Sequence, residues 1–172
     1  TGSIGVSAVS LAGHLKGELA SVYLVCGDET LVVGEALDAL RLRARALGYT
    51  EREIHFVDSA SSWDDLRQSS AAMSLFAERR IVEVRMPRGK PGINGSAVLI
   101  ALIEAHAPDQ LLIIVTDRLE SASQSAAWVK AVEKHGVWLP IRDLRRNELN
   151  DWIEQRCRRA GLEPSADAVA LL

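Results

Sequence analysis

The feature that most constrains the fold is the alternation of short apolar runs with longer segments of helical periodicity. Val22–Cys26 and Leu111–Thr116 are apolar at consecutive positions, as is typical of strands buried on both faces. Between them, Glu29–Leu47 has apolar residues every three or four positions and is followed by Gly48, which favours a helix with a glycine cap. The pattern predicts an α/β domain: a doubly wound, mostly parallel sheet flanked by helices.

The other segments complete a sheet that we expect to have five strands. Further strands are expected at Glu53–Val57, Ile81–Met86 and Val137–Ile141. Further helices are expected at Ser10–Leu19, Trp63–Ala72, Ser96–His106 and Ser121–His135. Pro87–Gly95 contains two prolines and three glycines, so it is expected to be a flexible loop.

The alternation stops after Arg142, where a new pattern begins. Apolar residues recur there at helical spacing and form one stripe: Leu149, Trp152, Ile153, Cys157 and Ala160. Ser165 opens a second helix. We therefore expect residues 11–142 to form the α/β domain and residues 143–172 to be the start of a small helical, lid-like domain that is cut short. Residues 1–10 are expected to be a non-native or disordered start.

Composition argues against several classes of function. The net charge of -3 gives no overall attraction to nucleic acid. The longest apolar stretch, Ala97–Ile103, is far too short to span a bilayer, so we expect a cytoplasmic protein with no membrane partner. Cys26, Cys157 and four scattered histidines lack metal-ligand spacing, so no metal site is expected.

The turn after the first strand is where a doubly wound domain would hold a nucleotide. A P-loop needs G-x-x-x-x-G followed by Lys and Ser or Thr, whereas here Gly34 comes late and Glu35–Ala36 follows. Asp28 and Glu29 would also repel a phosphate at the helix N-terminus. We expect no cofactor and no catalytic residues; a nucleotide-binding ATPase remains the enzyme alternative.

A short apolar tip follows the second expected helix. It consists of Met73, Ser74, Leu75 and Phe76. Exposed apolar side chains of this size usually anchor a partner; the alternative is that Leu75 and Phe76 pack under the domain's own sheet.

Five segments are distinctive when they are taken together. They are Gly27-Asp28-Glu29, Trp63-Asp64-Asp65, Ala72–Arg80, Ser125–Trp128 and Asn147–Ile153. In combination they resemble one known family, the delta subunit of the bacterial DNA polymerase III clamp loader. The resemblance covers nearly the whole chain from about Leu11.

The resemblance implies an AAA+-like fold that has lost nucleotide binding and a non-catalytic subunit of the polymerase III holoenzyme, whose polymerase activity resides in another subunit. It implies that the tip enters a hydrophobic pocket on the beta sliding clamp and helps open the ring for loading onto primed DNA. The delta-prime and gamma/tau subunits would be its partners in the full-length protein. Family members continue into a collar domain, and this chain ends before it.

Charged residues supply two further hypotheses. Glu78, Arg79 and Arg80 directly follow the tip and are expected to make a second contact with the clamp. The basic residues Arg145, Arg146, Arg158 and Arg159 raise the alternative of a DNA-binding module. Acidic residues interrupt them, however, and mixed charge on a helix usually marks a solvated face.

Overall fold

The computed structural model describes residues 11, 13–73, 79–105, 109–142 and 146–170. The chain divides into two compact units, residues 1–142 and residues 143–172. The first unit contains the sheet, and the second contains two helices. The roles expected for the domains stay predictions.

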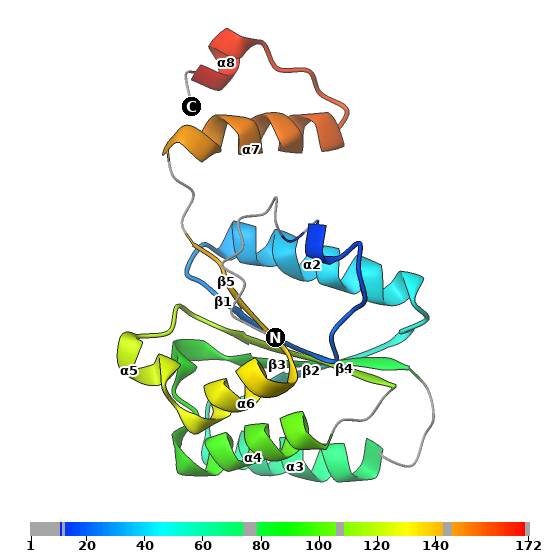
Figure 1. Cartoon of the computed structure of the whole chain (residues 1–172), viewed down its shortest axis with the longest axis vertical. Coiled ribbons are helices and arrows are strands. Elements are labelled where there is room, and N and C mark those ends of the chain that lie inside the picture. The colour runs from blue at the N-terminus through cyan, green and yellow to red at the C-terminus, as the bar shows by residue number, and fades with distance from the viewer. Residues whose placement is uncertain (1–10, 12, 74–78, 106–108, 143–145, 171–172) are drawn as a thin grey trace. The chain divides into compact units, whose positions relative to one another are not determined.

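The first unit is built on a five-stranded sheet in which every neighbouring pair is parallel (Figure 1). The strand order is β2-β3-β4-β1-β5. The strands are β1 Val22–Cys26, β2 Glu51–Phe56, β3 Arg80–Met86, β4 Gln110–Thr116 and β5 Val137–Pro140. The expected five-stranded sheet is therefore confirmed. The most apolar runs form β1 and β4 inside the sheet, where strands are covered on both faces.

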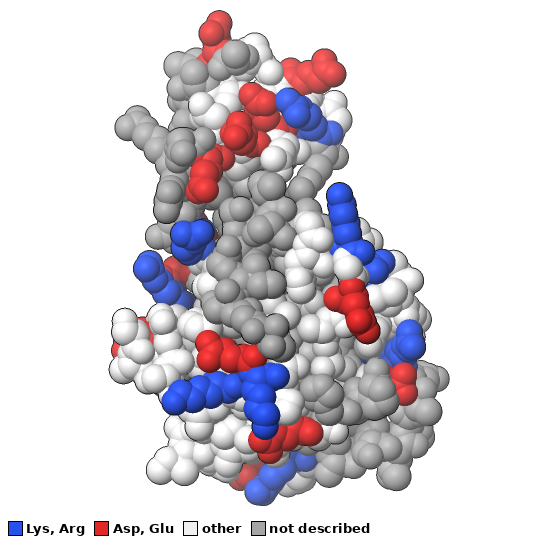
Figure 2. Space-filling model, viewed as in Figure 1, with Lys and Arg blue, Asp and Glu red and all other residues white. Residues whose placement is uncertain are grey.

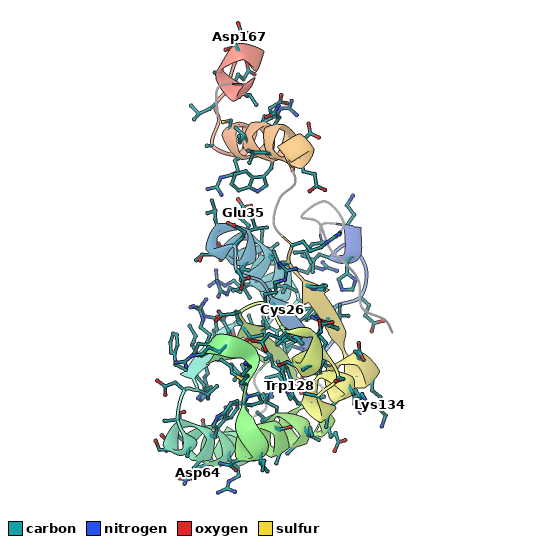
Figure 3. The ribbon with its side chains drawn as sticks, turned by 90° about the vertical axis from the view of Figure 1, so that its left-hand side faces the viewer. Cys26, Glu35, Asp64, Trp128, Lys134 and Asp167 are labelled. Carbon is teal, nitrogen blue, oxygen red and sulfur yellow. The ribbon has the colours of Figure 1, made fainter. Side chains whose placement is uncertain are left out.

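Helices cover both faces of the sheet (Figure 1). Helix α2, Thr30–Ala46, lies on one face. Three helices lie on the other: α3 Ala60–Met73, α4 Gly92–Glu104 and α6 Ala127–His135. Their core with the sheet includes Trp63, Leu66, Leu99, Ile103, Trp128 and Val132. Figure 3 shows Cys26 and Trp128 within these layers and Asp64 and Lys134 at the outer surface.

Three expectations about local structure were wrong. The helix expected at Ser10–Leu19 does not extend beyond His14. Pro87–Gly95 is not simply a loop, because a short 3-10 helix occupies Pro87–Gly89 and α4 begins at Gly92. Proline suits a helix start, since its fixed φ is already helical, and Pro91 is the N-cap of α4. Gly95 lies where α4 approaches α3 closely: a Cβ there would come within 2.5 Å of the Trp63 ring.

The helix expected over Ser121–His135 is instead two helices, α5 Ser121–Gln124 and α6. Ala126 between them has extended backbone, and the Ser125 hydroxyl donates to the Ala122 carbonyl at 3.0 Å. A serine that bonds local backbone in this way competes with helical hydrogen bonding.

The second unit contains α7 Arg146–Arg159 and α8 Ala166–Ala170. Gly161 has a φ of 74° after α7, and the Leu162 N–H donates to the Cys157 carbonyl at 2.8 Å. This left-handed glycine cap ends the helix.

Candidate functional site

The predicted tip lies between two described elements. Helix α3 ends at Met73 and strand β3 begins at Arg80. Ser74, Leu75, Phe76 and Glu78 lie outside the described residues, as does the side chain of Met73. The assignment of Met73, Ser74, Leu75 and Phe76 as the clamp-binding residues therefore stays a prediction.

Arg79 follows this segment directly and has several contacts with the domain. Its Nη1 donates to the Leu47 carbonyl at 2.6 Å, and its Nε lies 3.4 Å from Asp109 Oδ1. The guanidinium lies 5.7 Å from the centre of the Tyr49 ring, a distance at which cation–π attraction acts. Arg79 thus connects the turn before β2 with the residue before β4.

Arg80 is the first residue of β3, and its side chain lies mostly inside the domain. Only 14% of that side chain is exposed, and Nη1 lies 3.8 Å from Glu53 on β2. The Arg80 N–H donates to the Asp109 carbonyl at 3.0 Å. Arg79 and Arg80 are therefore both engaged by the domain itself, and their expected contact with a partner stays a prediction.

Strand β3 also contains a buried carboxylate that sequence reasoning missed. Glu83 is fully buried and accepts bonds from two nitrogens of Arg41 on α2, with closest contacts of 2.8 Å. Arg85 donates to the same carboxylate at 2.7 Å. The signal in the sequence is a glutamate flanked by two valines inside a buried strand, since a buried acid needs charged partners.

The turn between β1 and α2 has the place, but not the sequence, of a phosphate-binding loop. Asp28 Oδ1 accepts a bond from the Arg118 N–H at 2.9 Å. Gly27 packs against the residue after β5, because a Cβ on Gly27 would lie 2.7 Å from the Ile141 carbonyl oxygen. A carboxylate at this end of the sheet disfavours phosphate. That the chain binds no nucleotide stays a prediction.

The arginines of α7 are mixed with acidic partners. Arg158 pairs with Glu154 at 2.9 Å, and the Arg156 guanidinium lies 4.9 Å from the centre of the Trp152 ring. Figure 2 shows acidic and basic side chains together in this unit. Arg145 lies outside the described residues, as do the side chains of Arg146 and Arg159. Direct DNA contact by these four arginines stays a prediction.

Two features are absent from the part of the chain that the structure describes. Within it, no helix combines the length and apolar character needed to cross a membrane. The same residues contain no group of three or more His, Cys, Asp or Glu side chains arranged to hold a metal ion.

Comparison with known proteins identifies the family. The family model described as "DNA polymerase III, delta subunit" matches residues 23–142, more than half of the chain. The chain belongs to the DNA polymerase III delta subunit family. The resemblance seen in the sequence is therefore confirmed.

Two curated relatives match over most of this delta-family chain. It is 29% identical over 153 residues to DNA polymerase III subunit delta of Escherichia coli K12. That alignment covers 89% of this chain and 45% of the relative. It is 25% identical over 162 residues to the subunit delta of Haemophilus influenzae, with 92% and 47% covered. The chain spans about half the length of these relatives.

Solved structures show the same fold. The DNA clamp loader delta protein of Bacillus subtilis aligns with a TM-score of 0.62 at 19% identity, covering 95% of this chain and 50% of that one. AMPPCP-bound DnaA from Aquifex aeolicus aligns with a TM-score of 0.57 at 12% identity, covering 98% and 57%. The expected AAA+-like fold is confirmed.

Proposed function

We propose that this chain is the clamp-binding part of a clamp-loader delta subunit. In this proposal Met73, Ser74, Leu75 and Phe76 form an apolar tip that enters a hydrophobic pocket on the beta sliding clamp. The observation that carries the proposal is the family match over residues 23–142, which include the tip. The chain binds without catalysing a reaction, and ATP hydrolysis belongs to its partner subunits, gamma/tau, which assemble with delta and delta-prime in the complete loader.

The chemistry of the tip supports this role. Burying a Leu or Phe side chain fully contributes about 1.5–3 kcal/mol, and a few apolar anchors usually dominate an interface. Residues 74–78 lie between the end of α3 and Arg79, so the anchors are carried on a short segment. A short connection between packed elements has fewer conformations to lose on binding.

Ring opening requires more than binding. A binder shifts the clamp toward an open form only if it contacts that form better than the closed one. We propose that Glu78, Arg79 and Arg80 provide this second contact, so that the opened ring can be placed on primed DNA. Reversing their three charges, in a variant shown to fold by circular dichroism, should reduce opening, measured by fluorescence across one clamp interface. Unchanged opening would contradict the assignment.

Calorimetric titration of this chain into a bacterial beta clamp tests the binding claim. The double variant Leu75→Ala, Phe76→Ala should lose at least about 100-fold in affinity, since the two truncations together remove about 3–6 kcal/mol of burial.

A matched control comes from apolar residues that are exposed elsewhere. Leu42 is 71% exposed and Phe56 is 67% exposed. The variant Leu42→Ala, Phe56→Ala removes the same side-chain types and should bind like the unmodified chain. Absence of binding by the unmodified chain, or equal losses in both double variants, would contradict the proposal.

A further inference from the structure

The two flanks of helix α2 have different neighbours. Arg43 on one flank donates to the Gly17 carbonyl at 3.2 Å, so the segment before β1 lies against that flank. Arg41 lies on the opposite flank and reaches Glu83 on β3 at 2.8 Å. This second flank faces β3 and the edge strand β2, and α2 is the long helix on this face of the sheet (Figure 1).

The sheet beside this second flank is incompletely covered. Phe56 at the end of β2 is paired with Arg85 in the strand register, and the Arg85 guanidinium lies 5.6 Å from the centre of its ring. Since Arg85 also binds Glu83, both side chains lie on the α2 side of the sheet. Glu83 is fully buried, yet the Arg85 side chain is 37% exposed and Phe56 is 67% exposed. Burial therefore decreases from the middle of β3 toward the end of β2.

Exposed apolar side chains gather around this uncovered part. Among the described residues of the first unit, four large apolar side chains are exposed: Leu31, Leu42, Phe56 and Ile93. Leu31 and Leu42 are about three helical turns apart and therefore lie on one side of α2. Asp38 lies between them on that side, and its pairing with Arg41 at 2.8 Å places the side next to the flank above β3. Three of the four exposed side chains thus border the same part of the sheet, as is typical of an interaction surface.

Gly34 leaves open space on the same side of α2. It lies one turn after Leu31, and within the described part of the chain a Cβ built on it would meet no atom within 4 Å. A glycine inside a helix is less favourable than alanine, but it lets another backbone approach closely. The helix therefore offers a position where a second helix can pack closely.

The charge around this part of the sheet is mainly positive. Arg45 lies one turn after Arg41, and Arg52 lies on the same side of β2 as Phe56; both arginines are exposed. Among the described residues, neither Arg45 nor Arg52 has an acidic partner. A partner that carries carboxylates would complement this charge.

We propose that an α2–β2 surface, formed by Leu31, Gly34 and Leu42 of α2 and by Arg52 and Phe56 of β2, docks an acidic amphipathic helix of a protein other than the beta clamp. A helix is about 10 Å wide and strands lie about 4.8 Å apart, so one further helix beside α2 covers two strands, β3 and β2. Its apolar side packs on the three exposed anchors, and its carboxylates pair with the arginines. The inference is independent of the tip, because α3, which leads to the tip, lies on the opposite face of the sheet (Figure 1).

Fluorescence anisotropy with two synthetic peptides tests the surface. Both are helices of about 20 residues with leucine along one side; the remaining positions are mostly glutamate in one peptide and lysine in the other. The acidic peptide should bind the unmodified chain at least about tenfold more tightly than the basic one, and less tightly as salt is raised. Equal affinities, or no binding of the acidic peptide, would overturn the proposal.

The apolar part of the surface is tested by truncation and by filling its open space. Leu42→Ala, Phe56→Ala should weaken binding of the acidic peptide by at least about tenfold. Ile93→Ala removes a side chain that is 94% exposed at the start of α4 and should leave the affinity unchanged. Gly34→Gln should keep or raise the urea midpoint and still weaken binding by about tenfold, because the new side chain occupies the open space. Equal affinities in Gly34→Gln and the unmodified chain would contradict the close approach.

The charged part has a matched control on the other face of the sheet. Arg45→Glu, Arg52→Glu, folded by circular dichroism, should bind the acidic peptide at least about tenfold more weakly. Lys130→Glu, Lys134→Glu reverses two exposed charges on α6 and should have little effect. Equal losses in both double variants would reduce the effect to net charge and overturn the proposal.

Two other occupants are distinguished by the same variants. Dimerisation in sedimentation, abolished by Leu42→Ala, Phe56→Ala, would make the surface a contact between copies of this chain. Binding of a thymidine oligonucleotide that is tighter than that of the acidic peptide and is lost in Arg45→Glu, Arg52→Glu would make it a nucleic-acid site. Either result would overturn the assignment. Clamp affinity should be unchanged in both double variants, so failure of the proposed clamp binding and failure of this inference are separate results.

Discussion

The buried ion pair between β3 and α2 gives the sharpest stability prediction. The Glu83 side chain is 0% exposed and that of Arg41 is 13% exposed, with 2.8 Å between Arg41 Nη2 and Glu83 Oε2. The perturbation is Arg41→Met, which keeps much of the length and apolar character of the side chain. It leaves the Glu83 carboxylate with Arg85 as its charged partner, at 2.7 Å.

Removing one partner of a buried ion pair typically costs about 3–5 kcal/mol, because the remaining charge is left uncompensated. Arg85 still compensates Glu83 in part, so we expect the lower end, about 3 kcal/mol. Arg41 also pairs with Asp38, whose side chain is 77% exposed. An exposed pair of this kind contributes little to the free energy of unfolding. The double variant Arg41→Met, Glu83→Leu removes both charges and should recover most of the loss, since an apolar pair of similar volume is often as stable.

Urea unfolding followed by tryptophan fluorescence measures these free energies. With a urea m-value of about 1–3 kcal/mol/M, a 3 kcal/mol loss lowers the midpoint by about 1–3 M. A loss below about 1 kcal/mol for Arg41→Met would show that the pair behaves like a surface pair and would refute the reasoning. A double variant less stable than Arg41→Met alone would refute it as well.

Three further predictions concern the first unit. MgATP should produce no thermal shift, because the β1–α2 turn lacks P-loop residues; a clear shift would restore the nucleotide-binding alternative. Gly27→Ala should cost about 1–3 kcal/mol in urea unfolding, since its Cβ would lie 2.7 Å from the Ile141 carbonyl oxygen; a neutral effect would show that the turn yields easily. Burial raises the pKa of the Cys26 thiol above its ordinary value of 9.0, so the folded state holds this proton more tightly than the unfolded chain. The contribution of this thiol to the free energy of unfolding is therefore fully present below pH 9.0. It is lost as the pH rises from there through the higher pKa of the folded state. Urea unfolding on both sides of that pH should show the loss in the unmodified chain and a smaller loss in Cys26→Ala; equal losses would contradict it.

Strands and the long helix could be predicted because their residues follow simple burial patterns. Val22–Cys26 was expected and found with the same bounds, and α2 differs from its expected range by one residue at each end. The strand is a short run of consecutive apolar residues and the helix repeats the helical period, so both could be predicted from the local sequence alone.

The failures depend on contacts that the local sequence does not contain. A count of prolines and glycines in Pro87–Gly95 indicates a loop, yet Gly95 is there because α4 packs closely on Trp63. The contacts of Arg79 with Leu47 and Asp109 join residues about 30 positions apart. Periodicity carries no signal for such a pairing, so these contacts of Arg79 could be found only in the folded chain.

The most direct test of the central claim is photo-crosslinking from the tip itself. With p-benzoylphenylalanine in place of Phe76, irradiation in the presence of the beta clamp should give a covalent adduct that maps to an apolar pocket on the clamp. The same group in place of Phe56, which is 67% exposed, should give none. Adducts from position 56 but not from position 76, in a mixture where the two proteins bind, would contradict the assignment of the tip as the clamp-binding site.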